Sequence, residues 1–365
     1  MHKIKEIICN NYKIKVKDIL PLSGGWMNEK FLVLDENDKK YVFKIFTTKK
    51  IEKMSKGEFG INYLDNQTTN NLLIENYMHS KSLNCPEIIK SISNNLMIDY
   101  GDNRAVLMSF INGRNISRND ISNEQLFNLG YECGHMHLLF KNVDSDIYSG
   151  RYLKLPSILE LMQAYEQKNS SKTKELLPEY KELLNKQGEI IKIIKNTHII
   201  DEIPISVTHG DFADDNILFD GNTPYIVDFE LVRQNSHLQD VGRILMSYCL
   251  ENSSLNIDKI QIFLDGYNRI NNLTEREVLL SFITVWINEV DMWIKENYFD
   301  KEITPKAKRF QDELIYITYN FDNLITIYQS KEENVFDNYK QSEVVTKPTL
   351  SKVLRKNKYY GRIYK

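Results

Sequence analysis

The sequence has few of the features that are typical of secreted proteins, of proteins stabilised by structural metal sites or of membrane proteins. Its 365 residues include only four cysteines, none of them in a C-x-x-C pair: Cys9, Cys85, Cys133 and Cys249. Cysteines scattered in this way are typical of free thiols in a reducing compartment, and they argue against a disulfide framework or a zinc site. The longest apolar run, 278–287, contains Ser and Thr and is too short to span a bilayer.

An excess of positive charge is also absent. The chain has 47 Lys and Arg against 50 Asp and Glu, a formal net charge of −3, and this balance argues against general nucleic-acid binding. Residues 1–14 lack the apolar core of a signal peptide. We therefore expect a cytoplasmic globular protein with neither a nucleic-acid nor a membrane partner, of a length that suits a two-lobed enzyme. The sequence leaves the oligomeric state open.

The residues with the strongest chemical character lie between positions 204 and 242. The β-branched run 205–208 predicts a buried strand, which a His-Gly-Asp sequence ends at Asp211. A second apolar run begins at Asn216, an Asp-Gly-Asn turn follows, and a third run ends at Asp228. This order predicts that the three polar side chains surround one mouth, formed by a loop between strands and the end of a hairpin.

Two carboxylates and a carboxamide in one place suit a hard cation such as Mg²⁺. Phosphoryl transfer needs a positioned metal, a neutralised phosphate and a carboxylate that orients the attacking hydroxyl. Asp211 fits that catalytic base, Asn216 and Asp228 fit metal ligands, and His209 is expected to hold the loop through hydrogen bonds. The alternative is that all are ordinary loop residues, because a His-x-Asp-x₄-Asn spacing is weak by itself. The strand-like flanks and the following Asp-Phe favour a site.

The segments HGDFADDN and IVDFE resemble the catalytic core of the aminoglycoside phosphotransferase and choline kinase-like family of small-molecule kinases. The resemblance covers roughly residues 20–300 and is strongest over 205–245. It implies a two-lobed, protein kinase-like α+β fold, with an antiparallel sheet and one main helix in the N-lobe and a mostly helical C-lobe. It also implies ATP and Mg²⁺ as cofactors, with Asp211 as catalytic base and Asn216 and Asp228 as Mg²⁺ ligands.

Several differences separate the sequence from protein kinases themselves. The chain has no G-x-G-x-x-G, no Arg before Asp211 and no A-P-E after Asp228. Glu230 stands where protein kinases have Gly after Asp-Phe, a Gly that the small-molecule kinases do not keep. By the same resemblance, Asp240 is expected to brace the catalytic loop as a structural residue.

Lys44 is the expected nucleotide-binding lysine. It lies in YVFKIF, the return strand of a hairpin with a charged turn at 35–40. A lysine on a mostly buried strand face needs an anionic partner, which the α- and β-phosphates would supply; the alternative is an edge-strand lysine that reaches solvent. Ser23, Gly24 and Gly25 precede the first strand of this hairpin and are expected to bring backbone amides close to phosphate, with a plain turn as the alternative.

Glu75 is expected to pair with Lys44 from a helix over 71–83. Glu58 is a competing partner, but the Phe-Gly that follows it fits poorly in the middle of a helix. The connection 47–70 is long and polar, which is typical of a flap or a small inserted helix.

The resemblance also implies a hinge between the lobes, where backbone groups near Ser109 and Ile111 contact the adenine edge. We therefore predict an N-lobe over 1–110 and a C-lobe over 111–330. A basic, aromatic extension over 331–365 follows, which either packs along the C-lobe or contacts an anionic partner.

Helices are predicted over 1–20, 123–141, 157–200 with a break near Pro178, 257–271, 275–298 and 306–328. By resemblance, Glu289, Asp291 and Trp293 line the acceptor pocket, where acidic and aromatic side chains suit a cationic or amine-bearing acceptor. The alternative places the tryptophans in the core and the acids in solvent. His135 and His137 are expected to pack and not to bind metal, because residues two apart face different sides of a helix.

The sequence therefore predicts an ATP-dependent O-phosphotransferase that acts on a hydroxyl of a small molecule, an antibiotic or an amine or amino-alcohol metabolite. Aminoglycosides, choline-like amines, homoserine-like amino acids and sugars all remain possible acceptors, and a preference for ATP over GTP is not determined. The alternative of another class is a non-catalytic kinase-like binding or spore-coat-type protein. The joint presence of Lys44, Glu75, Asp211, Asn216 and Asp228 favours activity.

Overall fold

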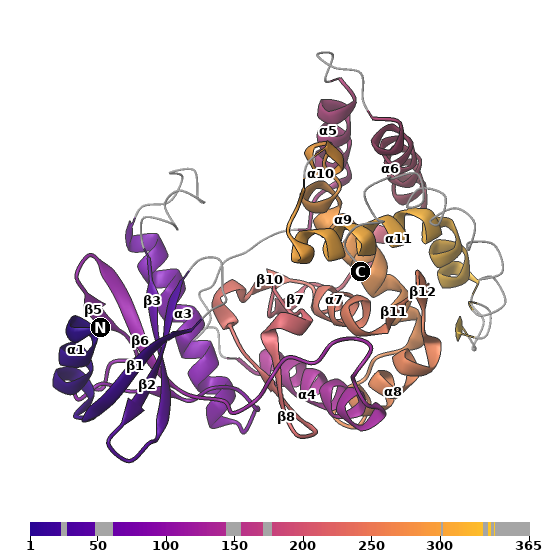
Figure 1. Ribbon diagram of the computed structural model, residues 1–365. Coiled ribbons are helices and arrows are strands. Elements are labelled where there is room, and N and C mark those ends of the chain that lie inside the picture. The colour runs from indigo at the N-terminus through magenta and orange to yellow at the C-terminus, as the bar shows by residue number, and fades with distance from the viewer. Residues whose placement is uncertain are drawn as a thin grey trace, which may run out of the picture.

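A computed structural model describes residues 1–22, 28–47, 61–143, 155–170, 177–300 and 302–330, together with 335, 336 and 339; for 61–67 and 300 it describes the backbone alone. The chain forms two lobes, a smaller one built on an antiparallel sheet and a larger one that is mostly helical (Figure 1). This is the two-lobed, protein kinase-like α+β fold that the sequence predicts.

The smaller lobe is organised by one sheet. Its strands are β1 (Val16–Leu22), β2 (Glu29–Asp35), β3 (Lys40–Phe46), β4 (Ile88–Ile89), β5 (Ile98–Tyr100) and β6 (Asn103–Ser109). Their order is β1-β2-β3-β6-β4, with β5 also paired to β6, and every pairing is antiparallel. The apolar faces of β2, β3 and β6 meet in the small-lobe core, where Val33, Phe43 and Leu107 are fully buried.

The β2–β3 turn shows why this part of the chain forms a hairpin. The Asp35 carboxylate accepts hydrogen bonds from the backbone N–H groups of Asn37 (2.8 Å) and Lys39 (2.9 Å). Asp38 has a φ of 61°, a left-handed conformation that Asp tolerates better than most residues. The hairpin predicted from the charged turn is confirmed, and it places Lys44 in the central strand β3.

Helix α1 (His2–Tyr12) covers one face of the sheet, with Ile4 buried. Lys13 has a φ of 54° and ends the helix. The prediction of a helix over 1–20 is therefore wrong beyond Tyr12. Residues 16–22 instead pair with β2, because their apolar side chains are buried by joining the sheet.

Helix α3 (Ile61–Ser80) connects the cores of the two lobes. Leu72 packs with the small-lobe residues of β3, β4 and β6, whereas Ile74 and Met78 belong to the core of the larger lobe. Beyond its C-terminus, Asn84 donates its backbone N–H to the Glu132 carboxylate in the larger lobe at 2.5 Å, and its carbonyl accepts from Ile226 at 2.8 Å. The end of α3 is thus fixed to the larger lobe.

The larger lobe consists of helices and short two-stranded ladders. Its helices are α4 (Asn123–Lys141), α5 (Ile158–Asn169), α6 (Pro178–Thr197), α7 (His237–Cys249), α8 (Ile257–Tyr267), α9 (Glu275–Trp293), α10 (Asn297–Asp300) and α11 (Pro305–Gln329), with 3-10 turns η1 (Ile199–Glu202), η2 (Asp214–Asn216) and η3 (Phe229–Leu231). Its strands are β7 (Ser206–Thr208), β8 (Ile217–Asp220), β9 (Thr223–Ile226), β10 (Arg233–Asn235), β11 (Leu250–Glu251) and β12 (Ser254–Leu255). The ladders are β10–β7, β8–β9 and β11–β12.

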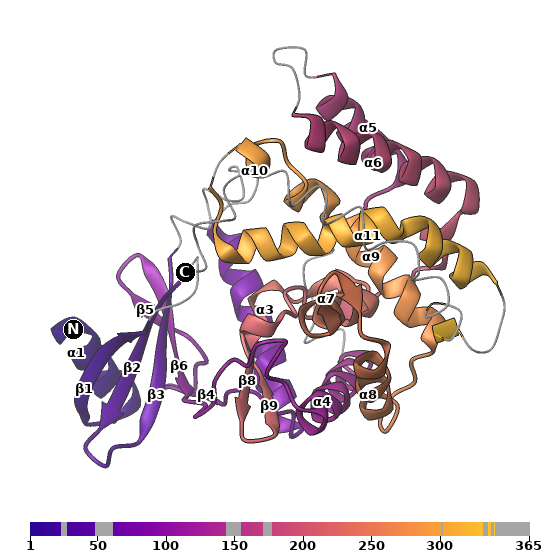
Figure 2. The same ribbon diagram turned by 45° about the vertical axis from the view of Figure 1, so that its right-hand side comes forward.

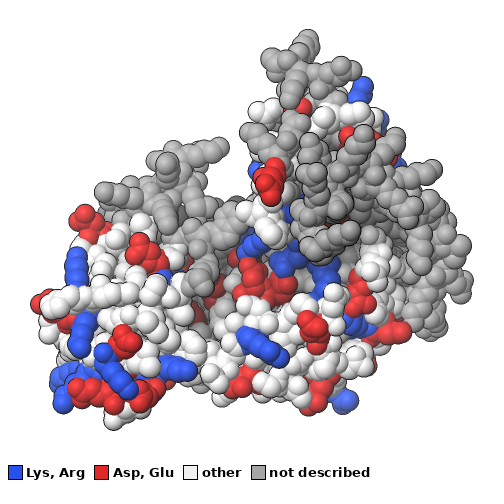
Figure 3. All heavy atoms as spheres, in the orientation of Figure 1, with Lys and Arg blue, Asp and Glu red and all other residues white. Residues whose placement is uncertain are grey.

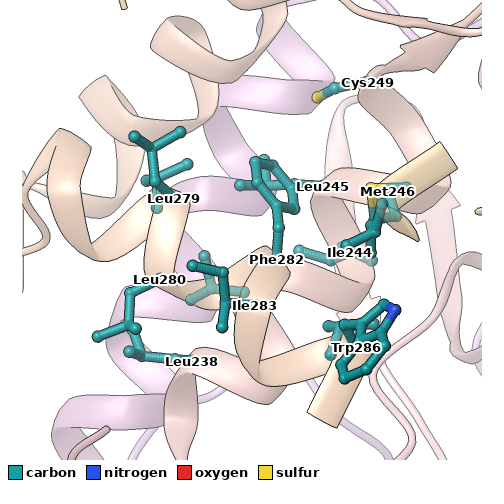
Figure 4. Close-up of a cluster of buried hydrophobic side chains, with 14 of the residues drawn as sticks. Leu238, Ile244, Leu245, Met246, Cys249, Leu279, Leu280, Phe282, Ile283 and Trp286 are labelled. Atoms are coloured by element: carbon teal, nitrogen blue, oxygen red, sulfur yellow. The ribbon is translucent and has the colours of Figure 1, made fainter. Parts of the chain in front are cut away.

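Helices α7 and α9 pack together at the centre of this lobe. Their contact is formed by apolar side chains (Figure 4), among them Leu238, Ile244, Leu245, Met246 and Cys249 of α7 and Leu279, Leu280, Phe282, Ile283 and Trp286 of α9. Trp286 is fully buried, and its Nε1–H donates to Thr318 Oγ1 of α11 at 3.0 Å. Trp286 is therefore a core residue, as one of the two sequence interpretations held.

Helices α5 and α6 stand out from the rest of the lobe (Figures 1 and 2). The predicted break near Pro178 is confirmed, because α6 begins at that residue. Proline is tolerated there since the first N–H groups of a helix have no partner within it. No helix in the described part of the chain combines the length and the apolar character needed to cross a bilayer. All four cysteines are free thiols.

Candidate active site

The loop that carries Asp211 leaves strand β7 through a glycine that no other residue could replace without strain. Gly210 has a φ of +81°, and a Cβ atom there would lie 2.2 Å from the carbonyl oxygen of Leu231. Only glycine allows the backbone to approach so closely in this conformation. The His-Gly-Asp sequence therefore permits a tight turn between β7 and Asp211.

Asp211 and Asn216 are joined directly. The Asn216 Nδ2 group donates to Asp211 Oδ2 at 3.0 Å and to its main-chain oxygen at 2.7 Å. The Val227 N–H donates to the main-chain oxygen of Asn216 at 3.0 Å, so the loop is tied to the residue before Asp228. Burial raises the pKa of Asp211, and the charge of Lys306 opposes this rise. A fixed carboxylate with a raised pKa suits a general base.

Asp240, in the first turn of α7, anchors the same loop. Its Oδ2 accepts the N–H of His209 at 2.7 Å and its Oδ1 accepts the N–H of Gly210 at 3.1 Å. Burial would raise the pKa of Asp240, but the hydrogen bond from His137 and further favourable electrostatic interactions together outweigh it, and the pKa is lowered. The bracing role expected of Asp240 is confirmed by these contacts. His137 also donates a hydrogen bond to Asp240, beyond the packing role expected for it.

His209 holds the loop by packing and by a hydrogen bond. Its ring lies edge-on to Phe229 with centroids 4.8 Å apart, and 5.7 Å from Phe212. The N–H of Asp211 donates to His209 Nδ1 at 3.4 Å. Burial lowers the pKa of His209 although the charge of Asp240 opposes it, so the ring stays neutral. The structural role predicted for His209 is confirmed.

Asp228 meets two lysines of the smaller lobe. It follows β9 with a φ of 72°, and its Oδ1 and Oδ2 lie 2.9 Å from Lys44 Nζ and 3.1 Å from Lys30 Nζ. Burial would raise the pKa of Asp228, but the two ammonium groups lower it well below its usual range. Lys44 and Asp228, 184 residues apart in sequence, are thus in contact across the two lobes.

Glu230 belongs to the same cluster, although the sequence did not assign it to the site. Its carboxylate pairs with Lys44 and accepts hydrogen bonds from Asn28 Nδ2, 2.6 Å to each oxygen. Its main-chain oxygen accepts from Asn71 Nδ2 of α3 at 2.5 Å. Burial raises the pKa of Glu230, and Lys44 opposes the rise. The signal in the sequence is the position of Glu230 directly after Asp-Phe, which distinguishes the chain from protein kinases.

Glu75 lies near Lys44 but does not pair with it. The residue is 4% exposed, and Oε1 has no hydrogen-bond partner within the described residues. Burial raises the pKa of Glu75 to about 8, although the charge of Lys44 opposes this. The predicted Lys44–Glu75 ion pair is therefore wrong for this structure, because Asp228 and Glu230 lie closer to the ammonium group. The competing Glu58 lies outside the described residues.

The remaining nucleotide contacts predicted from sequence are only partly visible. Residues 23–25, which include the glycine pair, lie outside the described residues. The N–H of Ser109, at the end of β6, donates to the Glu87 carbonyl at 2.8 Å, so this amide is already used within the lobe. The adenine contact expected near Ser109 and Ile111 stays a prediction.

Two of the three predicted acceptor residues, Glu289 and Trp293, are hydrogen-bonded to each other on α9. Glu289 accepts hydrogen bonds from Trp293 Nε1 at 2.8 Å and from Gln239 Nε2 at 2.5 Å, and it pairs with Arg243. Arg243 in turn interacts electrostatically with Asp211. Basic and acidic side chains gather near the middle of the face shown in Figure 3. Glu289 is thus largely buried and paired with Arg243. Neither sequence interpretation, acceptor binding or exposure to solvent, includes this ion pair.

Asp291, the third predicted acceptor residue, has a different environment. It pairs with Lys168 of α5 and accepts a hydrogen bond from Gln187 Nε2 of α6 at 3.0 Å. These contacts join α9 to the α5–α6 hairpin, and no described contact links Asp291 to Asp211. Its expected acceptor role stays a prediction without a supporting contact.

The residues present fit a nucleotide and a divalent cation. In the part of the chain that the structure describes, no three His, Cys, Asp or Glu side chains converge as a ready-made metal cluster. Mg²⁺ does not need one, because it is commonly held by one or two carboxylates, waters and substrate phosphates. Asp228 and Asn216 supply such oxygens, and Lys44 lies within 2.9 Å of Asp228. Oε1 of Glu75, which has no hydrogen-bond partner among the described residues, is an acceptor that interacts electrostatically with Lys44.

Comparison with known proteins agrees with this geometry. Residues 18–271 match the model of the phosphotransferase enzyme family, more than half of the chain. The chain therefore belongs to the phosphotransferase enzyme family, and its class is that of the small-molecule kinases. A homoserine kinase of Bradyrhizobium diazoefficiens is 34% identical over 77 residues, which is 20% of this chain. The matched stretch spans only 24% of that kinase.

Solved structures share the fold over nearly the whole chain. A spectinomycin phosphotransferase in complex with ADP and spectinomycin has a TM-score of 0.61 at 14% identity, over 88% of this chain and 98% of its own. An aminopropanol kinase associated with a microcompartment has a TM-score of 0.60 at 9% identity, over 90% and 98%. A choline kinase of Cryptosporidium parvum has a TM-score of 0.56 at 15% identity, over 88% and 96%. At such identities the similarity establishes the fold alone.

Proposed function

We propose that this chain transfers the γ-phosphoryl group of ATP to a hydroxyl group of a small molecule in the cytoplasm. The observation that carries the proposal is the convergence of a buried lysine, two carboxylates and a carboxamide from both lobes. Lys44 lies 2.9 Å from Asp228, and Asn216 lies 3.0 Å from Asp211, with Val227 joining the two pairs. Phosphoryl transfer needs this combination of positioned charges and little covalent chemistry from the protein.

Each residue has a separate task in this proposal. Asp211 orients the acceptor hydroxyl and accepts its proton as the oxygen attacks phosphorus. Asn216 fixes Asp211 through its Nδ2 and, with Asp228, would hold Mg²⁺. When bound, Mg²⁺ neutralises charge on the phosphate oxygens and on the departing diphosphate. Lys44 binds the α- and β-phosphates, and Asp240 keeps the loop in position through two backbone N–H groups.

The acceptor side of the site supports an amine-bearing or amino-alcohol compound, or an antibiotic of that character. Trp293 and Glu289 lie together on α9, and Arg243 links them electrostatically to Asp211. An aromatic face beside a carboxylate suits an ammonium group. Spectinomycin, choline and aminopropanol appear in the names of kinases with this fold, which also favours small hydroxyl compounds.

The proposal is tested by measuring ADP release with Mg²⁺ and ATP across a panel of amino alcohols, aminoglycosides, hydroxy amino acids and sugars. Asp211→Asn serves as the control, and GTP replaces ATP in a parallel series. We expect at least one class of compound to stimulate ADP release by the unaltered protein and not by the variant. Equal release by both proteins would contradict the catalytic role of Asp211. No nucleotide binding by the unaltered protein would contradict the proposed function itself.

A further inference from the structure

Lys30 is a second lysine of the nucleotide site that the sequence did not single out. The register of the sheet pairs Lys30 of β2 directly with Lys44 of β3. Directly paired residues of neighbouring strands have their side chains on the same face of the sheet. Both ammonium groups consequently reach the larger lobe, where they contact different oxygens of the Asp228 carboxylate.

Two ammonium groups share the single carboxylate of Asp228. Like charges at neighbouring cross-strand positions repel each other, so the pair is stable only where anions are shared. Lys44 has a second carboxylate partner in Glu230, whereas Lys30 contacts only Asp228 among the described residues. The Lys30 side chain is 24% exposed and that of Lys44 only 7%. Lys30 therefore lies at the solvent side of the cluster.

The two lysines respond differently if Asp228 binds a cation, as in the proposed function. Once the carboxylate binds a divalent cation, its negative charge no longer suffices to neutralise two ammonium groups. Lys44 would keep Glu230 as its partner, but Lys30 would be left without one. Glu230 and Glu75 interact electrostatically with Lys30 but form no ion pair with it among the described residues. A phosphate group bound beside the metal would supply the direct partner that Lys30 loses.

We propose that Lys30 is a second phosphate-binding residue, which contacts the outer phosphates of the nucleotide while Lys44 contacts the inner ones. This inference rests on the proposed function, because it needs a nucleotide in the cleft. We assign Lys30 to the outer phosphates because its side chain is more exposed than that of Lys44. Lys30 thereby favours a nucleoside triphosphate over a monophosphate, and it acts on binding without taking part in proton transfer.

The test compares the affinities of ATP, ADP and AMP for four proteins by calorimetry in the presence of Mg²⁺. The proteins are the unaltered chain, Lys30→Ala, Lys30→Arg and a control, Lys17→Ala, which removes a lysine of β1 whose partner is the exposed Asp38. Loss of a charge-assisted hydrogen bond predicts that Lys30→Ala binds ATP roughly tenfold to a hundredfold more weakly. The affinity for AMP should not change, Lys30→Arg should retain most of the ATP affinity, and Lys17→Ala should behave as the unaltered chain.

Each other outcome contradicts the inference. Unchanged ATP affinity in Lys30→Ala would mean that Lys30 does not contact phosphate. An equal loss for ATP and AMP, or a lowered melting temperature without nucleotide, would assign Lys30 a structural role. These results leave the proposed function intact as long as the unaltered protein binds ATP. Failure of the unaltered protein to bind any nucleotide would instead overturn the proposed function, and this inference with it.

Discussion

Asp211 and Asp240 are buried carboxylates of the same loop region, and their surroundings shift their pKa values in opposite directions. Burial dominates at Asp211 and raises its pKa. At Asp240 the hydrogen bond from His137 and further favourable electrostatic interactions together outweigh burial and lower the pKa. Asp211 is therefore suited to take up a proton, whereas Asp240 stays ionised and holds the loop. Pairs of carboxylates whose environments separate their pKa values are a recurrent sign of divided roles in active sites.

The first prediction concerns Asp211→Asn. The amide cannot accept the hydroxyl proton, and removal of a general base typically costs about 10²- to 10⁴-fold in rate. We expect kcat to fall by that factor while the ATP affinity changes only a few fold. Asp220→Asn, at the exposed turn of the β8–β9 hairpin, is the matched control and should retain full activity. A variant at position 211 with unreduced kcat would exclude Asp211 as the base.

The second prediction concerns Glu132, whose carboxylate accepts the backbone N–H of Asn84. Burial raises the pKa of Glu132 to about 7, above that of a carboxyl in the unfolded chain. Between these two pKa values the folded state keeps a proton that the unfolded state releases, so the free energy of unfolding falls as the pH rises toward 7 and stays lowered above it.

Glu132→Gln removes this pH dependence and keeps the acceptor for Asn84. At pH 8 we expect the variant to be more stable than the unaltered protein by about 2–3 kcal/mol, and at pH 5 to differ by less than about 1 kcal/mol. Urea unfolding at both pH values measures this, with Glu124→Gln at an exposed position of α4 as the control. The same stability difference at both pH values would show that ionisation of Glu132 is not its cause.

At the scale of elements, helices α4 and α8 approach each other through glycines on both sides. A Cβ atom at Gly130 would lie 2.0 Å from the Phe263 carbonyl oxygen, and one at Gly266 would lie 2.0 Å from that of Phe127. Real Cβ atoms do not come so close to backbone, so a side chain at either position would force the helices apart. The crossing matters for the site, because α4 carries His137, which binds Asp240.

The third prediction is that Gly266→Ala destabilises the protein in spite of the better helix propensity of alanine. Overpacking of this kind typically costs about 1–3 kcal/mol. Asp265→Ala, at the exposed neighbouring position of α8, should change the stability by less than about 0.5 kcal/mol. Chemical denaturation of both variants measures the difference. A stability of Gly266→Ala equal to that of the control would show that the helices can separate without cost.

Elements with strong local signals could be predicted from the sequence. The capping box of Ser122 and Gln125 begins α4 where the apolar periodicity begins, and the turn at Asp35 defines the β2–β3 hairpin. The predicted N-terminal helix is longer than α1, because the end of α1 depends on Lys13 in a left-handed conformation and on the pairing of β1 with β2. Neither feature can be recognised from the residue types or the apolar periodicity of this segment.

The site shows the same division between local and distant determinants. Asp211, Asn216 and Asp228 lie within one short stretch, so their grouping could be predicted from the motif. The partners of Lys44 could not, because they depend on how the two lobes meet. Glu230 and Lys30 join the cluster through lobe contacts and strand register. Their charges are visible in the sequence, but their distances to Lys44 and Asp228 are not.

At the scale of the whole molecule, polar contacts around the site join the two lobes in addition to the apolar packing of α3. Lys30 and Lys44 reach Asp228, and Asn28 and Asn71 reach Glu230. A ligand that binds both sides of this junction stabilises the folded protein by mass action. The increase in the free energy of unfolding on ligand binding therefore shows whether residues of both lobes bind the same ligand.

The fourth prediction is that ATP with Mg²⁺ raises the melting temperature of the unaltered protein. At a ligand concentration of one hundred times Kd, the stabilisation is about 2.7 kcal/mol. Asp228→Asn should lose the part of this effect that requires Mg²⁺, because it removes the proposed metal-binding carboxylate. Thermal unfolding with ATP, with and without Mg²⁺, separates the two parts. An equal Mg²⁺-dependent shift in Asp228→Asn would exclude Asp228 as a metal ligand.

In the proposed function, phosphorus passes from ATP to an acceptor hydroxyl under the control of Asp211. Phosphorus NMR of the reaction with an accepted hydroxyl compound follows that atom directly. We expect the γ-phosphorus signal of ATP to be replaced by that of a phosphomonoester with the unaltered protein, and to persist with Asp211→Asn. Appearance of inorganic phosphate alone, or of the ester at the same rate with Asp211→Asn, would contradict the proposed function.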